Sequence, residues 1–274
     1  MTSRTGAFRA FEHAGWQGAA RRYDDAFGSL TRQAIDPLLD AAEVRSGARA
    51  LDVASGPGYV AAAAAARGAR VTGVDFSLAM VRLARAQNSG VKFRKGNAES
   101  LPFPDGSFDA VVMNFGMLHL ARPEHALSEA LRVLRPGGRY AFTVWAKPEE
   151  ALGFGIILEA VRKHGNPDVS LPPGPPFFRF SDARESETVL KIAGFQKVSV
   201  QRVPQVWRFS EPGLLFDAFL GGTVRTQALL HAQSAQALEA IRAAAAKAAE
   251  AFQTQGTVEI PMPAVLAAAA KPEK

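Results

Sequence analysis

The chain contains no cysteine among its 274 residues. Disulfide bridges, thiolate metal sites and a cysteine nucleophile are therefore excluded. Long apolar runs are also missing, because none approaches the ~20 residues that a membrane-spanning helix needs. Residues 1–8 lack the apolar core of an export signal. We therefore expect a cytoplasmic protein without a membrane span.

Neither positive nor negative charge is concentrated in one part of the sequence. Lys and Arg number 32 against 26 Asp and Glu, which gives a net charge of +6. No dense basic run with interleaved aromatic residues accompanies this excess, so we expect a solvated arginine-rich surface and no nucleic-acid partner. The five histidines do not show metal-ligand spacing, and no metal is expected.

A short segment near residue 50 carries the most specific pattern. Residues 50–53 form an apolar run typical of a buried strand, and a glycine-rich turn at 56–58 and an alanine-rich run at 61–66 follow. Glycine permits a sharp turn and a close ligand approach, and the next helix start presents free N–H groups. A second predicted strand, 71–74, ends at Asp75, whose carboxylate can accept both hydroxyls of a ribose. The pattern predicts a nucleoside-binding βαβ unit.

The same segment leaves the nucleotide ambiguous. Gly56, Gly58 and Ala61 also match the spacing of the dinucleotide fingerprint, which admits NAD as well as S-adenosylmethionine. Asp52 lies within the first strand, four residues before Gly56. A carboxylate there repels a pyrophosphate but suits a sulfonium and an ammonium group. Asp52 therefore favours S-adenosylmethionine, and an NAD(P)-binding oxidoreductase stays open as an alternative.

Four motifs follow one another in the order of a known family. They span residues 51–58, 73–80, 96–109 and 132–139. Together they resemble class I S-adenosylmethionine-dependent methyltransferases, and they are most similar to the type 11 group, which includes ubiquinone and menaquinone C-methyltransferases. The resemblance covers roughly residues 45–146. It implies a Rossmann-like, doubly wound α/β sheet of seven strands, mostly parallel, with an antiparallel strand seven between strands five and six.

The whole chain, residues 1–274, is expected to form one domain around this core. Further strands are expected at 91–94, 110–114, 140–145 and 196–209, and residues 258–267 are expected to lead into strand seven. The resemblance implies a helical cover at 1–43, a cofactor-binding core at 45–146 and a helical lid at 211–257, inserted between strands six and seven. Gly221 and Gly222 predict a hinge in that lid.

The resemblance also assigns residues to the cofactor, S-adenosylmethionine. Phe76 is expected to stack on adenine, with plain core packing as the alternative. Asn97 stands where the family usually has Asp, so its amide oxygen is expected to accept from the adenine amino group. Asn114 ends the fourth expected strand, so its backbone carbonyl is expected to hold the ligand's ammonium group, with a turn-forming role as the alternative. The full set of expected cofactor residues is Tyr23, Asp52, Ala54, Gly56, Gly58, Asp75, Phe76, Met80, Asn97, Ala98 and Asn114.

The acceptor side is less specific. No catalytic residue is assigned. His119 is the candidate base, because imidazole titrates near neutral pH, and a structural role in the cofactor shell is the alternative that the resemblance favours. Arg225 is expected to bind either a substrate anion or a lid carboxylate. The residues expected to line an acceptor pocket are Trp16, His119, Phe177, Phe178, Trp207, Phe216 and Arg225.

These features predict an enzyme that moves a methyl group from S-adenosylmethionine to an oxygen, nitrogen or carbon atom of a small aromatic or apolar molecule. A protein that binds S-adenosylmethionine without transferring the methyl group is a second alternative, beside the oxidoreductase. The expected partner is the small-molecule acceptor alone, and the chain is expected to be a monomer or a homodimer.

Overall fold

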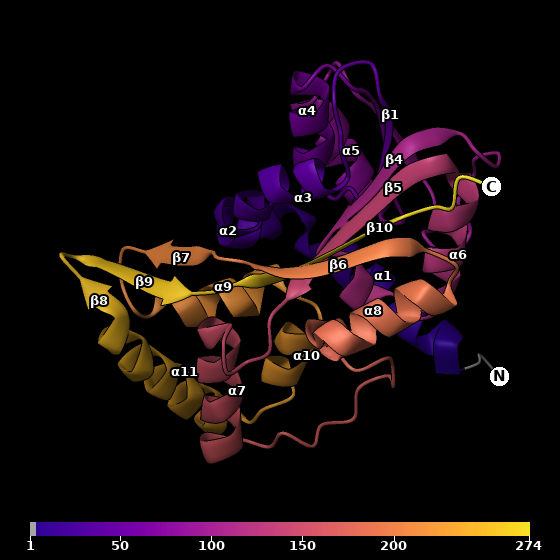
Figure 1. Cartoon of the computed structure of the whole chain (residues 1–274). Coiled ribbons are helices and arrows are strands. Elements are labelled where there is room, and N and C mark those ends of the chain that lie inside the picture. The colour runs from indigo at the N-terminus through magenta and orange to yellow at the C-terminus, as the bar shows by residue number, and fades with distance from the viewer. Residues whose placement is uncertain (1–3) are drawn as a thin grey trace.

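The computed structural model describes residues 4–274, apart from the side chain of residue 21. A seven-stranded sheet forms its centre, with the strand order β3-β2-β1-β4-β5-β10-β6 (Figure 1). β10 runs antiparallel to both neighbours, β5 and β6, and the pairs among β1 to β5 are parallel. This is the expected Rossmann-like sheet. The strands are β1 (Arg49–Val53), β2 (Arg70–Asp75), β3 (Lys92–Lys95), β4 (Phe108–Asn114), β5 (Leu134–Trp145), β6 (Gln196–Val203) and β10 (Ala264–Ala270).

Helices cover the sheet. Figure 1 shows α3 (Ile35–Ala41) and α4 (Tyr59–Ala66) on one side and α6 (Pro123–Val133) and α8 (Ala183–Ile192) on the other. β10 is buried along its whole length, because it lies in the sheet interior between two strands. It therefore reads as a continuous apolar run instead of an alternating one.

The turn after β2 begins a helix as the sequence predicts. α5 (Leu78–Gln87) has Ser77 as its N-cap, and the Oγ of Ser77 accepts a hydrogen bond from the backbone N–H of Met80. A capping hydroxyl satisfies one of the N–H groups that a helix start leaves unpaired. The cap therefore fixes the chain immediately after Asp75.

A second, three-stranded sheet is a feature that the sequence did not predict. Its order is β7-β9-β8, with β7 (Val206–Phe209), β8 (Gln253–Thr254) and β9 (Thr257–Pro261). The expected long strand at 196–209 ends at Val203, because Pro204 lacks a backbone donor and the chain then leaves β10 to pair with β9. Residues 258–267 were expected to lead into strand seven. Residues 258–261 of this segment belong to the separate strand β9, and strand seven, β10, begins at Ala264.

The segment between β7 and β8 is helical, as expected. It contains α9 (Leu214–Gly222), α10 (Arg225–His231), α11 (Ala235–Ala249) and the 3-10 turn η5 (Glu250–Phe252). α7 (Leu152–His164) packs against α11 below the sheet (Figure 1). A loop joins α7 to the 3-10 turn η4 (Arg179–Ser181), which leads into α8.

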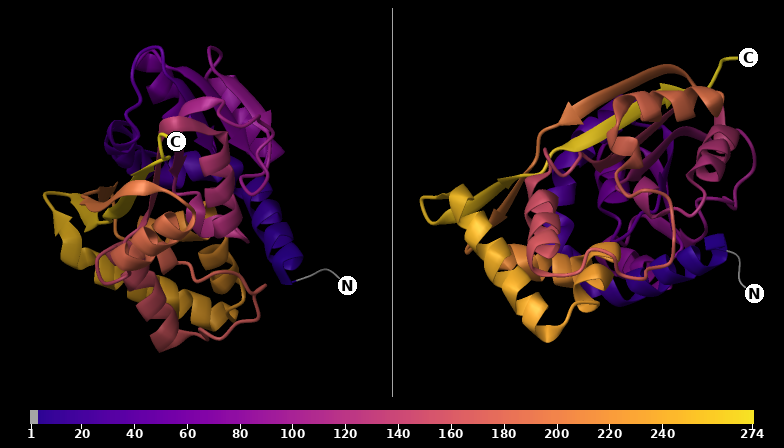
Figure 2. Two further views of the ribbon diagram at one scale, coloured as in Figure 1. Left: turned by 45° about the vertical axis from the view of Figure 1, so that its right-hand side comes forward. Right: turned by 90° about the horizontal axis from the view of Figure 1, so that it is seen from below.

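The N-terminal region is helical and lies against this insertion (Figure 2). It comprises α1 (Arg4–Tyr23), a π-helical turn η1 (Asp24–Gly28), α2 (Ser29–Thr31) and the 3-10 turn η2 (Arg32–Ala34). A Cβ at Gly222 would lie 2.7 Å from Ala26 and 2.8 Å from the Phe27 ring. The glycine expected to form a hinge is therefore required for close packing of α9 against η1.

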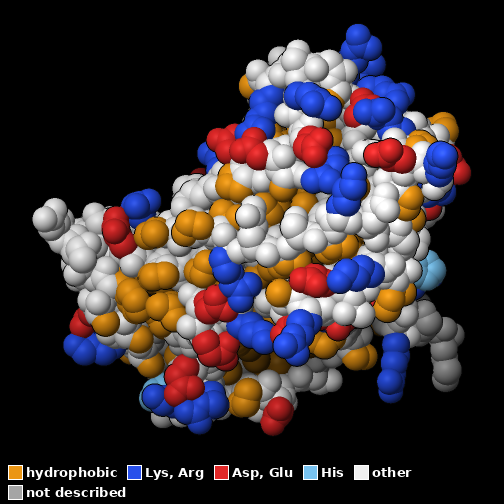
Figure 3. Space-filling view, in the orientation of Figure 1, with side chains coloured by type: hydrophobic (Ala, Val, Ile, Leu, Met, Phe, Trp, Pro, Cys, Tyr) orange, Lys and Arg blue, Asp and Glu red, His pale blue; other side chains and the backbone are white. Residues whose placement is uncertain are grey.

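The molecular surface mixes both signs of charge. On the face in Figure 3, Lys and Arg side chains alternate with Asp and Glu side chains. Within residues 4–274, no helix is both long enough and apolar enough to cross a membrane.

Candidate functional site

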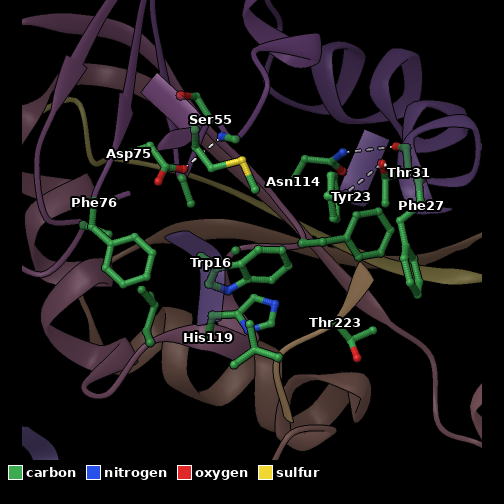
Figure 4. A pocket seen from close by; sticks show the side chains of 18 of the residues that line it. Trp16, Tyr23, Phe27, Thr31, Ser55, Asp75, Phe76, Asn114, His119 and Thr223 are labelled. Carbon is green, nitrogen blue, oxygen red and sulfur yellow. Dashed lines mark hydrogen bonds between the residues drawn. The ribbon is translucent and has the colours of Figure 1, made fainter. Parts of the chain in front are cut away.

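A cavity lies at the carboxyl ends of β1, β2 and β4, where ligands bind in open α/β sheets. Its floor comes from the turns after these strands, and α1, η1 and residues 222–226 cover it (Figure 4). Ten of the eleven expected cofactor residues line this cavity. They are Tyr23, Asp52, Ala54, Gly56, Asp75, Phe76, Met80, Asn97, Ala98 and Asn114.

The eleventh expected residue, Gly58, is not among the lining residues and instead shapes the turn after β1. Its φ is +89°, and a Cβ there would lie 2.6 Å from the Phe93 ring. Gly56 also has a positive φ, +50°, but nothing lies within 4 Å of its missing Cβ. Open space beside Gly56 leaves room for a ligand to approach the backbone. Ala54 adopts a φ of +56°, a conformation that costs a non-glycine residue free energy and recurs at functional sites.

Asp75 is held rigidly at the end of β2. Its Oδ2 accepts from the N–H of Gly56 at 2.9 Å and its Oδ1 from the N–H of Ser77 at 2.8 Å. Burial raises the pKa of Asp75 to about 6, although these two hydrogen bonds oppose the rise. The carboxylate is therefore mainly ionised at neutral pH and each oxygen keeps a further lone pair for a hydroxyl donor.

Asp52 is a buried acid with an unpaired oxygen. Its Oδ2 accepts from the N–H of Ala61 at 3.0 Å, but its Oδ1 has no partner in the described part of the chain. Burial, with a smaller contribution from the charge of Asp75, raises the pKa of Asp52 to about 8. An unpaired buried carboxyl oxygen is costly unless a ligand satisfies it. The site therefore fits a ligand that brings positive charge, such as the sulfonium and ammonium groups of S-adenosylmethionine.

On the expected adenine side, Phe76, Met80 and Ala98 line the cavity together with Asn97. The Oδ1 of Asn97, expected to accept from adenine, already accepts from the N–H of Glu99 at 3.0 Å. The Asn97 side chain therefore shapes the loop, because a short Asn can close a turn on its own backbone.

Asn114 is likewise fixed by its side chain. Its Nδ2 donates to the carbonyl of Thr31 at 3.1 Å (Figure 4). Its Oδ1 accepts from the hydroxyl of Thr143 at 2.6 Å. Tyr23 donates to the Oγ1 of Thr31 at 3.3 Å, and burial raises the pKa of Tyr23 to about 12. Asn114 thus ties the N-terminal cover to β4 and β5, and its side chain has no free group for a ligand beyond the second lone pair of Oδ1.

Aromatic side chains form the other half of the cavity. Trp16 and Phe177 lie there as expected. The sequence missed Phe115 and Trp145, whose rings stack at 4.0 Å between centroids, and also Phe27 and Phe154. Their signal was weak, because an aromatic residue at the end of a strand or in a helix is usually ordinary core.

Three residues expected to line an acceptor pocket do not line this cavity. Trp207 and Phe216 are only 1% and 0% exposed and belong to the main hydrophobic core. Trp207 donates its Nε1–H to the carbonyl of Ala26, which fixes η1. Phe178 packs edge-on against Phe154 at 5.4 Å. Large apolar side chains predict burial, and sequence alone cannot tell a core from a ligand pocket.

Arg225 and His119 share one carboxylate. Glu12, in the middle of α1, is fully buried; its Oε1 accepts from Arg225 Nε at 2.8 Å and its Oε2 lies 3.0 Å from His119 Nδ1. Arg225 also donates to the carbonyls of Pro175 and Leu118. Of the two expectations for Arg225, the structure places it on a carboxylate, although that carboxylate belongs to α1 and not to the lid.

Sequence reasoning missed Glu12. It lies on the same helical face as Phe8 and Ala19, both buried, so an acid on an apolar stripe was the available signal. Within residues 4–274, no group of three or more acidic or histidine side chains is arranged to hold a metal ion.

Comparison with known proteins agrees with this site. Residues 51–142 match the model of a family described as a methyltransferase domain. The demethylmenaquinone methyltransferase of Clavibacter sepedonicus is 38% identical over 144 residues, which cover 50% of this chain and 56% of that protein. The same-named protein of Beutenbergia cavernae is 41% identical over 150 residues, which cover 51% and 61%.

A solved structure shows the same fold over a longer stretch. Haemonchus contortus phosphoethanolamine N-methyltransferase 2, in complex with S-adenosyl-L-methionine, has a TM-score of 0.57 at 20% identity, covering 97% of this chain and 60% of that chain. The matches to curated relatives span little more than half of each relative's length. The comparisons favour neither the oxidoreductase nor the non-methylating alternative. Residues 51–142 therefore form a methyltransferase domain similar to that of the demethylmenaquinone methyltransferases, and 97% of the chain shares the fold of a methyltransferase solved with S-adenosyl-L-methionine.

Proposed function

We propose that this protein transfers the methyl group of S-adenosylmethionine to an oxygen, nitrogen or carbon atom of a small, flat, aromatic or apolar molecule. One observation carries the proposal: the βα turn with its two buried acids and a cluster of aromatic rings line a single cavity. A cofactor on the acidic side therefore shares that cavity with an apolar acceptor on the aromatic side.

In this proposal the chain's own residues bind and orient. Asp75 accepts the ribose hydroxyls, Gly56 allows close backbone approach, and Asp52 offers an unpaired oxygen to a cationic group. The cofactor supplies a methyl group already activated by positively charged sulfur. The protein holds the acceptor in line with it, and such positioning can contribute roughly 7–11 kcal/mol to lowering the barrier.

The organisation of the chain follows the same proposal. Residues 45–146 bind the cofactor, residues 1–43 cover it, and residues 211–257 close the acceptor side. α1 connects these segments. Gln17 Oε1 accepts from the hydroxyl of Ser77 in the cofactor-binding core at 2.6 Å. Gly15 packs closely on Val224 in the lid, because a Cβ at Gly15 would lie 2.4 Å from the Val224 side chain.

The acceptor is proposed to carry a planar ring. The aromatic cluster favours such a molecule, and the curated relatives are named for methyl transfer to demethylmenaquinone. The attacking atom is left to experiment.

The test is methyl transfer in solution. Wild-type protein is incubated with methyl-labelled S-adenosylmethionine and a panel of naphthohydroquinones, phenols, aromatic amines and phosphoethanolamine. We expect label and S-adenosylhomocysteine to appear in equal amounts with at least one planar acceptor. Transfer to phosphoethanolamine alone contradicts the acceptor class, and binding of NAD in place of S-adenosylmethionine contradicts the function.

A further inference from the structure

The two oxygens of Glu12 have different partners. Oε1 accepts from Arg225 and Oε2 faces Nδ1 of His119, at 2.8 Å and 3.0 Å. The carboxylate itself has no exposed surface, whereas the His119 side chain is 18% exposed. The pair therefore joins a fully buried acid to a histidine that reaches open space.

The ionisation of Glu12 defines where His119 carries a proton. Burial raises the pKa of Glu12, but His119 and Arg225 outweigh burial and leave that pKa below its ordinary value. An ionised carboxylate has only acceptor sites. His119 must therefore donate Nδ1–H to Glu12, so the neutral imidazole carries its lone pair on Nε2.

Nε2 of His119 points to no protein partner. Within residues 4–274, no hydrogen bond is made by Nε2, and it is not among the buried unpaired atoms. His119 lines the cavity with its ring edge-on to Trp16, at 4.9 Å between ring centroids (Figure 4). Its ring is also edge-on to Phe177, at 6.1 Å. The free lone pair thus lies at the aromatic side, where the acceptor is proposed to bind.

We propose that the acceptor carries a ring hydroxyl group, that His119 removes the proton of this hydroxyl, and that Glu12 is the positioning residue that makes His119 a base. The inference rests on the proposed function and specifies its substrate class. A carboxylate that fixes Nδ1–H and stabilises the resulting imidazolium is a recurring way to activate histidine.

The proposed step balances. The O–H proton moves to His119 Nε2, and the oxygen or the conjugated ring carbon takes the methyl group. The electron pair of the broken methyl–sulfur bond stays on sulfur, which leaves neutral S-adenosylhomocysteine. Where oxygen attacks, His119 ends as an imidazolium beside Glu12 and releases its proton to solvent after the product leaves. Where carbon attacks, the proton on that carbon leaves to solvent as the ring is restored, and the regenerated phenolate oxygen takes its proton back from His119 Nε2.

The charged groups around His119 balance one another. Glu12 and Arg225 offset one another from α1 and α10. A second carboxylate, Glu99, contacts the chain just after His119. It accepts from the backbone N–H groups of Ala121 and Arg122 and forms ion pairs with the side chains of Arg9 and Arg122. Glu12 and Glu99 are therefore each paired with at least one arginine.

The first test reads the tautomer directly. Histidine labelled with 15N is observed by NMR in wild-type protein saturated with S-adenosylhomocysteine, and His119→Gln assigns the signal. We expect the neutral ring to be in the Nδ1–H form, with Nε2 unprotonated. An Nε2–H form overturns the proposal. The tautomer is read on the wild-type protein, and His125→Gln, at an exposed histidine on α6, controls the assignment.

The second test asks whether a bound hydroxyl loses its proton to His119. 4-Nitrophenol, whose phenolate absorbs visibly, is titrated with pH in the S-adenosylhomocysteine complex. On the wild-type protein we expect ionisation at least roughly one pH unit lower than on His119→Gln or Glu12→Gln. Equal titration on wild type and His119→Gln overturns the proposal. If calorimetry shows that S-adenosylhomocysteine does not bind at all, the proposed function fails instead.

Discussion

Asp52→Asn removes a buried titratable group without changing the shape of the side chain. In the wild-type protein, burial raises the pKa of Asp52 from 3.8 to about 8, and Oδ1 has no partner. The amide oxygen of Asn can still accept from the N–H of Ala61. The substitution therefore isolates the cost of a buried carboxylate from the loss of a hydrogen bond.

The sign of the effect follows from proton linkage. The pKa of Asp52 is higher in the folded than in the unfolded protein, so protonated Asp52 stabilises the folded state. This contribution is fully present below about pH 4 and is lost as the pH rises through 8. Between pH 6 and pH 8.5 the difference corresponds to about 3 kcal/mol in the free energy of unfolding. Asn does not titrate, so the variant lacks this loss.

Urea unfolding of the cofactor-free protein at the two pH values measures the difference. We expect wild type to lose about 3 kcal/mol more than Asp52→Asn between pH 6 and pH 8.5. Calorimetry should show that Asp52→Asn binds S-adenosylmethionine at least roughly tenfold more weakly, because an ionic partner for the ligand is lost. Equal pH dependence of unfolding in the two proteins would refute the reasoning.

Three further predictions concern the same cavity. Asp75→Ala should weaken S-adenosylmethionine binding by ~2 kcal/mol or more, roughly 30-fold, because charge-assisted hydrogen bonds are lost; unchanged affinity in calorimetry excludes Asp75 from the site. Gly58→Ala should lower the free energy of unfolding by ~1–3 kcal/mol, because its φ is +89° and Phe93 fills the Cβ position, whereas Gly90→Ala, with open space around it, should be near neutral in the same urea assay. Amide hydrogen exchange of residues 4–30 and 211–254 should slow when S-adenosylhomocysteine binds, since both segments cover the cavity; protection equal to that of β1 and β4 without ligand means that they are not a lid.

The sheet was predictable because its signals are local. The apolar runs before and after the turn at 56–58 specify β1 and α4, and Ser77 marks the start of α5. The end of β6 was not predictable to the same degree. It depends on which strand the chain pairs with after Pro204, and that partner, β9, lies more than 50 residues away.

The residues of the site likewise fall into those that local sequence patterns predict and those that only the three-dimensional packing reveals. Asp75 and Gly56 are found from spacing, because a nucleoside needs an acid and a close backbone at fixed positions relative to two strands. Glu12 is not found so easily, because its two partners are 107 and 213 residues away in the sequence. Trp207 was assigned to a pocket because size and apolarity are shared by core and ligand-binding residues, and only the packing separates them.

A crystal structure with S-adenosylhomocysteine bound tests the central claim most directly. The account predicts that the ribose hydroxyls bind Asp75, that the amino-acid part lies beside Asp52, and that the sulfur faces Trp16 and Phe177. A ligand bound outside this cavity, or one whose sulfur faces away from the aromatic side, would contradict the account.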